Sequence, residues 1–249
     1  NAIDRGELAL HYQPLVDGNM GRLVGMEALL RWTDPDGKDV APGHLIPLAE
    51  DSGLMVPLGL WILDRACRDI AELHTRYASD FPVMVNFSPS QFQRSDFVET
   101  LLDAVSRHGL RSEYIEIEVT EGILLDNMDQ VIVKLHQLKA AGFRISLDDF
   151  GTGYSSLNYL KNLPIDKLKI DRSFVKDVVS DRHDAAITKA IIALAHHLDV
   201  KVVAEGVETE AQFWFLKRNF CDEFQGYLFG KPMPLDVLGL QLRSQGNRV

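Results

Sequence analysis

Cysteine, long apolar stretches and positive charge are all scarce in this sequence, and each shortage excludes a class of protein. Among 249 residues there are only 2 cysteines, Cys67 and Cys221, and they do not form a CxxC pair. A disulfide framework needs more partners than that, so we expect two reduced, partly buried thiols of the kind found in cytosolic proteins.

No apolar run is long enough for a membrane-spanning helix. The longest runs, such as residues 190–195, stop well short of the roughly 18 residues that a span needs, and no signal peptide opens the chain. We therefore expect a soluble cytoplasmic domain that makes no membrane contact of its own. Because the chain starts at Asn1 rather than Met, it reads as a piece of a longer protein, whose location, including a membrane anchor, stays open.

Positive charge is in deficit, with 26 Lys and Arg against 36 Asp and Glu, a formal net charge of −10. Binding to a nucleic-acid polymer rests on a Lys and Arg surface that neutralises phosphates, so this class of partner is disfavoured. An acidic protein that handles phosphate needs cations from elsewhere. Metal ions held by carboxylates would supply them locally.

What is present is the pattern of an α/β barrel. Short β-branched or apolar runs alternate with helix-period stretches, which is typical of βα units around a parallel sheet, and such barrels commonly run to about 250 residues as one domain. We therefore expect one modified TIM (β/α)8 barrel over residues 1–249. The expected strands are residues 8–16, 23–30, 83–87, 114–119, 144–147, 167–170, 201–204 and 223–228; the expected helices are 58–77, 96–108, 127–141, 184–198 and 208–218.

Residues 17–20 join the first two expected strands, and this turn is far too short for a crossover helix. The two strands should therefore pair antiparallel, which reverses the first strand of the barrel. On propensity alone, residues 23–30 are equally compatible with a helix. Asp96 and Thr209 stand where helix N-caps are wanted, and Gly142 stands at a C-cap.

Acidic residues gather at the ends of the expected strands. That is the face on which barrel enzymes build their sites. An inward-facing lysine in KLKID would be costly to bury without anionic neighbours. The candidates are the carboxylates Glu27, Glu118, Asp148, Asp149 and Glu205, together with Asn86 and Lys169.

Each candidate alone has an ordinary structural explanation: Glu27 as the exposed position of a helix, Asp149 as a cap, Glu205 as a solvated turn residue. Together, five like charges at one rim repel one another unless cations lie among them. The eight histidines show no HxH or HExxH spacing, so the oxygen-rich set suits Mg²⁺ or Mn²⁺ rather than zinc. Adjacent carboxylates can serve two ions about 4 Å apart, which predicts metal-assisted phosphoester hydrolysis.

Seven motifs, in order and nearly end to end, carry a resemblance to a known family. They are MEALLRW from Met26, VNFSPSQF from Val85, IEIEVTEG from Ile115, LDDFGTGYSSL from Leu147, KLKIDRSFV from Lys167, VVAEGVET from Val202 and FQGYLFGKPMP from Phe224. Together they resemble the EAL-domain family of cyclic di-GMP phosphodiesterases.

The resemblance implies a barrel with its first strand reversed and a cut, dependent on two Mg²⁺ or Mn²⁺ ions, that opens cyclic di-GMP to linear pGpG. It also implies a homodimer, often fused to GGDEF or sensory domains. We expect Ca²⁺ to occupy the site and inhibit, because its longer bonds would displace the attacking water. In the metal set, Glu27, Asn86, Glu118 and Asp148 would hold the first ion, and Asp149 and Glu205 the second. Lys169 would orient or activate the attacking water, and the catalytic set is Lys169, Glu27 and Glu205.

The resemblance also assigns residues to the substrate and to a loop that couples dimerisation to metal binding. Arg31 would contact a phosphate and Gln13 would lie near a guanine, while Gln225 would complete the hydrogen bonding around the site. Pro232 joins this substrate-binding set. The loop set is Glu121, Phe150, Gly151, Thr152, Gly153 and Glu208.

Two other functions remain open at this point. A catalytically silent receptor for cyclic di-GMP would need the ligand pocket but neither Lys169 nor a full metal set, so the complete set favours an enzyme. A barrel hydrolase for some other phosphodiester remains if the guanine contacts fail.

Overall fold

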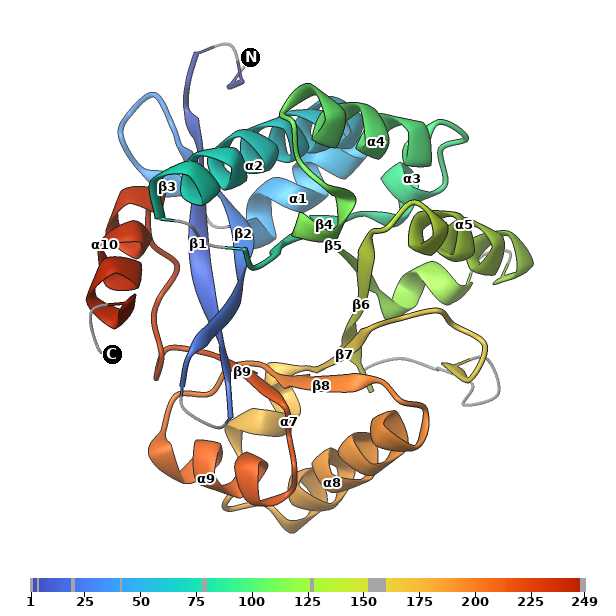
Figure 1. The fold of residues 1–249 in the computed structure, drawn as a ribbon, viewed down its shortest axis with the longest axis vertical. Coiled ribbons are helices and arrows are strands. Elements are labelled where there is room, and N and C mark those ends of the chain that lie inside the picture. Colours follow the sequence, from blue (N-terminus) through green and yellow to red (C-terminus); the bar gives the residue numbers. More distant parts are fainter. Residues whose placement is uncertain are drawn as a thin grey trace.

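A computed structural model describes residues 2–3, 5–18, 21–40, 42–77, 80–125, 128–151 and 160–246 of the chain. Within these residues eight strands close into a barrel, and the two-residue strand β3 (Asp39–Val40) extends β2 outside the ring (Figure 1). The barrel strands are β1 (Leu8–Asp17), β2 (Leu23–Thr33), β4 (Val83–Phe87), β5 (Ile115–Thr120), β6 (Arg144–Phe150), β7 (Lys167–Ile170), β8 (Lys201–Ala204) and β9 (Glu223–Gln225).

One barrel strand runs against the others. β1 pairs antiparallel with both β2 and β9, whereas every other neighbouring pair in the ring is parallel. The reversed first strand predicted from the short turn is therefore confirmed. Residues 23–30, which propensity left open, lie in a strand because their alternate side chains fill the barrel interior and contact the surrounding helices.

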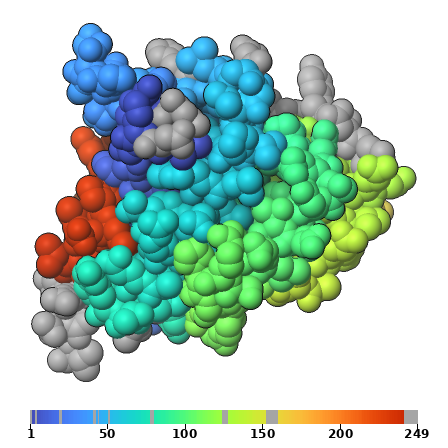
Figure 2. Space-filling view, turned by 90° about the horizontal axis from the view of Figure 1, so that it is seen from above, coloured from blue at the N-terminus to red at the C-terminus, as the bar shows by residue number. Residues whose placement is uncertain are grey.

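The helices surround the strand ring (Figure 1). Seen from above, the side chains of α2 and α4 lie next to each other and cover one flank of the barrel (Figure 2). None of the described helices is both long enough and apolar enough to span a membrane. They are α1 (Pro42–Asp51), α2 (Met55–Tyr77), α3 (Pro89–Phe92), α4 (Phe97–Arg107), α5 (Met128–Ala140), α7 (Arg172–Lys176), α8 (Arg182–His197), α9 (Glu210–Arg218) and α10 (Leu235–Gly246), with 3-10 turns η1 (Ser112–Tyr114) and η2 (Glu121–Leu125).

The three predicted helix ends are found where the sequence placed them. Thr209 forms a capping box with Gln212, and Gly142 follows α5 with φ +90°, a conformation that glycine adopts without strain. Asp96 stands at the N-cap position of α4, as predicted, but it does not cap the helix through its side chain. Its side chain makes no capping bond and accepts instead a hydrogen bond of 2.9 Å from Nε of Arg94.

The last strand is shorter than expected, because β9 ends at Gln225. The chain turns at Gly226, where it passes so close to Val207 that an added Cβ would lie 2.1 Å from the Val207 carbonyl oxygen. Val207 in turn donates its backbone N–H to the Gln225 carbonyl. This close crossing requires glycine and brings the segments after β8 and β9 together.

Side chains that face the barrel interior form layers. Leu15, Met84 and Val203 are fully buried and contact one another as an apolar middle layer. Polar side chains lie on both sides of this layer, at the carboxyl ends of the strands and at their amino ends. Layers built from alternate strands are the usual filling of such barrels.

Candidate active site

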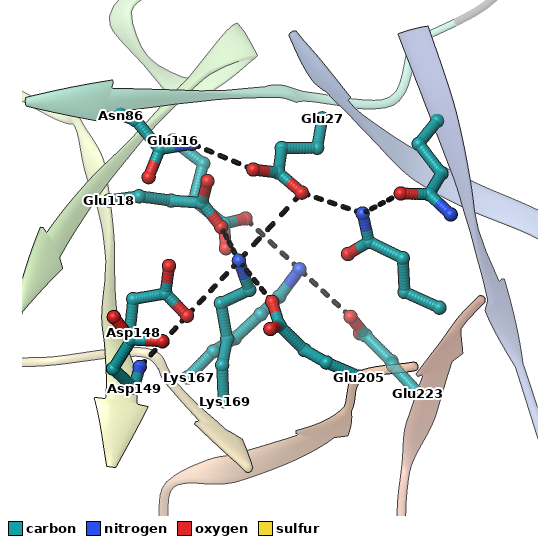
Figure 3. Close-up of polar contacts among 12 residues, drawn as sticks. Glu27, Asn86, Glu116, Glu118, Asp148, Asp149, Lys167, Lys169, Glu205 and Glu223 are labelled. Atoms are coloured by element: carbon teal, nitrogen blue, oxygen red, sulfur yellow. Dashed lines mark hydrogen bonds and ion pairs between the residues drawn. The ribbon is translucent and has the colours of Figure 1, made fainter. Parts of the chain in front are cut away.

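The predicted site residues meet at the carboxyl ends of the barrel strands (Figure 3). They come from six successive parallel strands, so the closure of the barrel brings together positions that are up to 178 residues apart, from residue 27 to residue 205. Glu27 lies on β2, Asn86 on β4, Glu118 on β5, Asp148 and Asp149 on β6, Lys169 on β7, and Glu205 directly after β8.

Lys169 is the centre of this group and is fully buried. Its Nζ lies 2.5 Å from Oε1 of Glu118 and 2.6 Å from Oε1 of Glu205. Asp148 Oδ1 is 3.4 Å away and Glu27 Oε2 is 3.9 Å away. Burial by itself would lower the pKa of Lys169, but these carboxylates, Asp148 foremost, raise that pKa well above its usual value. The side chain is therefore an ammonium that can donate protons to hydrogen bonds.

The acids carry more negative charge than one lysine offsets. Burial is the main cause that raises the pKa of Glu118, and it raises the pKa of Glu205 to about 8. The pKa of Asp149 is raised by burial and by its neighbour Asp148. Carboxyl groups shifted in this direction lack positive charge around them, and a bound cation would supply it.

The oxygen atoms of the site fit a hard cation. One carboxylate oxygen from each of Asp148, Asp149 and Glu205 lies within 4.8 Å of the others. Apart from its ion pair with Lys169, the buried Glu118 carboxylate has no hydrogen-bond partner among the described residues, and the same holds for Oε1 of Gln225. A set of ligands made of oxygen suits Mg²⁺ or Mn²⁺.

A local irregularity in β6 explains how two consecutive acids reach one site. In a regular strand successive side chains point to opposite faces. The pairing of β6 with β7 shifts register between Leu147 and Phe150, and Asp149 has φ +56°, which is uncommon for a residue with a side chain. The Asp149 N–H donates to Oδ1 of Asp148 at 2.9 Å. Such strain costs about 1–3 kcal/mol and is typical of functional sites.

Glu27 is held in place by two amides. Asn86 Nδ2 donates to Oε1 of Glu27 at 2.7 Å, and Gln225 Nε2 donates to Oε2 at 2.6 Å. Gln225 Nε2 also donates to Oε1 of Gln13 at 3.2 Å, and Gln13 Nε2 donates to the Gly230 carbonyl at 3.2 Å. The two glutamines assigned to substrate thus adjoin the acidic cluster, and Asn86 keeps its amide oxygen for a cation.

An open cleft of about 660 Å³, solvent space included, adjoins the cluster. Arg172 was missed by the sequence analysis although it directly follows KLKID at the end of β7. Glu208, assigned to the loop set, lies on the cleft, whereas Arg31 and Pro232 are not among its lining residues. The lining is Gln13, Glu27, Leu29, Arg172, Glu205, Gly206, Glu208, Gln225, Gly226 and Tyr227.

The expected loop begins where β6 ends. Glu121 is buried, and its Oε2 accepts a hydrogen bond of 3.2 Å from the Gly151 N–H. Gly151 has φ +97°, and Phe150 before it is buried. Thr152 and Gly153 lie outside the described residues.

A family model described as EAL domain matches residues 1–232 of this chain. MucR of Pseudomonas aeruginosa, named a bifunctional diguanylate cyclase/cyclic di-GMP phosphodiesterase, is 47% identical over 237 residues, which are 95% of this chain and 35% of that protein. NbdA of Pseudomonas aeruginosa, named a cyclic di-GMP phosphodiesterase, is 44% identical over 243 residues, 98% of this chain and 31% of that protein. The chain thus spans about a third of the length of these relatives.

Solved structures agree with the sequence comparisons. The MucR phosphodiesterase in complex with c-di-GMP superposes with a TM-score of 0.91 at 48% identity, over 95% of this chain and 96% of that chain. BlrP1 of Klebsiella pneumoniae, solved as a calcium and cyclic di-GMP complex, superposes with a TM-score of 0.80 at 29% identity, over 94% of this chain and 57% of that chain.

Proposed function

The chain belongs to the EAL-domain family, and from that premise we propose that it hydrolyses cyclic di-GMP to linear pGpG with the help of two Mg²⁺ or Mn²⁺ ions. The observation that carries the proposal is the convergence of four carboxylates on a buried lysine, beside a cleft lined by two glutamines and an arginine. Relatives named as cyclic di-GMP phosphodiesterases, and a relative solved with c-di-GMP, support the choice of substrate.

In this proposal the acidic cluster holds the ions. Two bound ions would supply Lewis acidity at the phosphate and lower the pKa of an attacking water. Oε2 of Glu118 has no hydrogen-bond partner among the described residues and could bind a cation, and Asn86 orients Glu27 through the 2.7 Å hydrogen bond. Glu27, Asn86, Glu118 and Asp148 would hold the first ion, and Asp149 and Glu205 would hold the second.

Lys169 acts as a hydrogen-bond donor. The surrounding carboxylates raise its pKa and so favour the ammonium form, in which Lys169 would orient the attacking water or stabilise negative charge on the phosphate. In hydrolysis the water oxygen joins phosphorus, the P–O3′ bond breaks, and the 3′ oxygen leaves with a proton. A buried cation beside the developing negative charge is worth most in the transition state.

The cleft selects the cyclic dinucleotide. Gln13 and Gln225 offer amide groups to a guanine edge, and Arg172 faces the same cleft with a permanent positive charge for a phosphate. Gly206 allows this arginine to lie against the backbone, since a Cβ at Gly206 would meet the Arg172 Cβ at 2.6 Å. Arg31, half-buried on β2, is the second arginine that we assign to phosphate.

We also propose that the domain works in the cytoplasm, as one barrel of a homodimer and as a module of a longer polypeptide. The relatives that it matches are about three times its length, which supports fusion to GGDEF or sensory domains. The Glu121 contact with Gly151 supports a loop that couples the dimer to the metal site.

The experiment is to incubate the purified protein with cyclic di-GMP and Mg²⁺ and to separate the products by chromatography. We expect pGpG with Mg²⁺ or Mn²⁺, and binding without turnover in Ca²⁺, whose longer bonds displace the water by a fraction of an ångström. Glu27→Gln, which keeps the shape of the side chain, should bind cyclic di-GMP without hydrolysing it. Binding without turnover in Mg²⁺ would identify a silent receptor, and no binding would indicate a different phosphodiester.

A further inference from the structure

A second group of buried charges lies inside the barrel, at the amino ends of the strands. Lys167 Nζ is 3.0 Å from Oε2 of Glu116 and 2.8 Å from Oε2 of Glu223. The three residues, named here the lower trio, are 4%, 0% and 5% exposed, in the order Lys167, Glu116 and Glu223 (Figure 3). None of them is part of the proposed metal or substrate site.

The lower trio is not required to fill the barrel. Leu15, Met84 and Val203 form an apolar cluster in the barrel interior, and apolar side chains could fill the lower layer as well. Taking charges out of water is costly, and a well-packed apolar replacement of a buried ion pair is often equally stable or more stable. The charges therefore need an explanation other than stability.

The register of the strands offers an explanation for the buried charges of the lower trio. Each member of the lower trio lies two residues before a member of the site on the same strand: Glu116 before Glu118 on β5, Lys167 before Lys169 on β7, and Glu223 before Gln225 on β9. Side chains two residues apart on a strand share a face. The trio thus lies directly beneath three residues of the site.

The lower trio also links strands that do not pair with each other. β6 lies between β5 and β7, and β8 lies between β7 and β9, so the backbone ladder fixes these three strands only through intermediates. Two short ion pairs to one ammonium fix them directly across the interior. Ion pairs demand a defined geometry, whereas apolar contacts tolerate sliding. Lys201, which is mostly exposed, adds a contact of 3.3 Å to Glu223 from outside.

We propose that Lys167 is a positioning residue, which through Glu116 and Glu223 holds Glu118, Lys169 and Gln225 at the spacing that hydrolysis requires. The proposal rests on the proposed function for its kinetic test. It does not require the lower trio to touch an ion or the substrate. A displacement of about 1 Å in a catalytic group can cost roughly a hundredfold in rate, so a small loss of register is measurable.

The test compares Lys167→Met with a matched control, Lys139→Met. Lys139 pairs with Asp166, directly before β7, at 2.6 and 2.7 Å, but outside the barrel interior. The readouts are kcat and KM for cyclic di-GMP at saturating Mg²⁺, the Mg²⁺ dissociation constant by calorimetry, and the melting temperature. For Lys167→Met we expect kcat to fall about tenfold or more and Mg²⁺ binding to weaken about tenfold. Lys167→Arg should keep most of the parent's kcat and Mg²⁺ affinity. Lys139→Met should change kcat and Mg²⁺ affinity by no more than about twofold, although this variant too loses an ion pair.

A further variant separates the loss of correct positioning from a failure to fold. Lys167→Met leaves two buried carboxylates unpaired and could fail to fold. The triple variant Glu116→Gln/Lys167→Met/Glu223→Gln removes all three charges together, so it should fold and still show the loss of kcat and of Mg²⁺ affinity. A folded triple variant with both quantities at the parent level overturns the proposal, as does an equal loss in Lys139→Met. If the parent itself has no turnover, the proposed function fails, and the Mg²⁺ dissociation constants alone decide the role of Lys167.

Discussion

Lys169 contacts the acidic cluster at the carboxyl ends of the strands, where its Nζ lies 3.9 Å or less from four carboxylates. It therefore has two effects that experiments can separate. It offsets the charge of the acids when no ion is bound, and in the proposed function it donates a hydrogen bond during hydrolysis. Both follow from an ammonium whose pKa is raised by its neighbours.

Replacement of Lys169 by alanine should show both effects. We expect kcat to fall by a factor of about 10²–10⁴, the range for a group that acts on protons in the transition state, with binding of cyclic di-GMP largely kept. The metal-free variant should melt at a lower temperature than the metal-free parent, because four acids lose their counter-charge. Saturating Mg²⁺ should then raise the melting temperature of the variant more than that of the parent.

Steady-state kinetics and calorimetry with and without Mg²⁺ check this prediction. A variant with a higher KM but an unchanged kcat would contradict the donor role. An equal rise of melting temperature with Mg²⁺ in parent and variant would contradict the role as counter-charge.

The sequence predicted which acids form the site better than it predicted the strand irregularity and the buried charges around them. Glu27, Glu118 and Glu205 were found because strand ends are recognisable and because barrel closure brings strand ends together. The bulge in β6 that turns both Asp148 and Asp149 to the site depends on tertiary structure, and no residue pattern in the sequence predicts it. Lys167 and Glu116 were missed because charges near a strand start are usually solvated, whereas in the folded barrel both are buried.

At the scale of elements, Glu121 links the turn η2 to the end of β6. It accepts a hydrogen bond from Gly151, two residues after Asp149. One hydrogen bond to a charged acceptor is worth about 1.5–3 kcal/mol. Its loss should therefore weaken Mg²⁺ binding indirectly, by about tenfold or more, since 1.4 kcal/mol corresponds to about a factor of ten.

Glu121→Ala and its control Glu113→Ala test this link. Glu113 is a partly exposed acid of η1 that pairs with Arg111 at 2.8 Å. It lies before the start of β5, whereas Glu121 lies after the end of β5. We expect the activity of Glu121→Ala to be low at limiting Mg²⁺ and to recover largely at high Mg²⁺, whereas Glu113→Ala should follow the parent. Normal activity of Glu121→Ala at limiting Mg²⁺ would refute the coupling.

A buried tyrosine fixes the reversed strand to the longest helix. The hydroxyl of Tyr12, on β1, donates to Oδ2 of Asp69, on α2, at 2.7 Å, and Nε of Arg65 donates to both oxygens of Asp69 at 2.9 and 3.0 Å. Burial, with the charge of Asp69, raises the pKa of Tyr12 well above its usual value near 10. Gln13, the next residue, faces the site, so this contact helps to place it.

Tyr12→Phe should lower the free energy of unfolding by about 1.5–3 kcal/mol at neutral pH, since one hydrogen bond to a charged acceptor is lost. The pH dependence has a definite sign. The tyrosine contribution is fully present below the unfolded pKa of about 10 and is lost as pH rises above it, because only the unfolded phenol releases its proton. Urea unfolding of parent and variant from pH 7 to 11 should show a difference that shrinks with pH; a difference that grows would contradict the account.

The helices that the sequence patterns did not predict have weak local signals. α3 and α7 are too short to show a helical period, and α1 contains Pro47, which removes a hydrogen bond from the helix interior. α10 contains Gly239, a weak helix former, whose lack of a side chain leaves room for the Tyr77 ring of α2. These helices form because tertiary packing outweighs local propensity.

At the scale of the whole molecule, the barrel brings distant short motifs to one rim and leaves the acids short of positive charge there. The formal net charge of −10 is spread over the sequence, but five acids meet within one site. Closure of the barrel is what brings these five acids together. The central claim is therefore that metal ions held by these acids promote the attack of water on a phosphodiester.

Hydrolysis of cyclic di-GMP in ¹⁸O-labelled water, followed by mass spectrometry of the product, tests that claim most directly. With Mg²⁺ present, the protein should form pGpG with one ¹⁸O atom on its 5′-phosphate, because the water oxygen joins phosphorus when the P–O3′ bond breaks. Removal of the ions with EDTA should stop the reaction, and added Mg²⁺ should restore it. Intact cyclic di-GMP after incubation with Mg²⁺ or Mn²⁺, or pGpG that forms equally well in EDTA, would contradict the account.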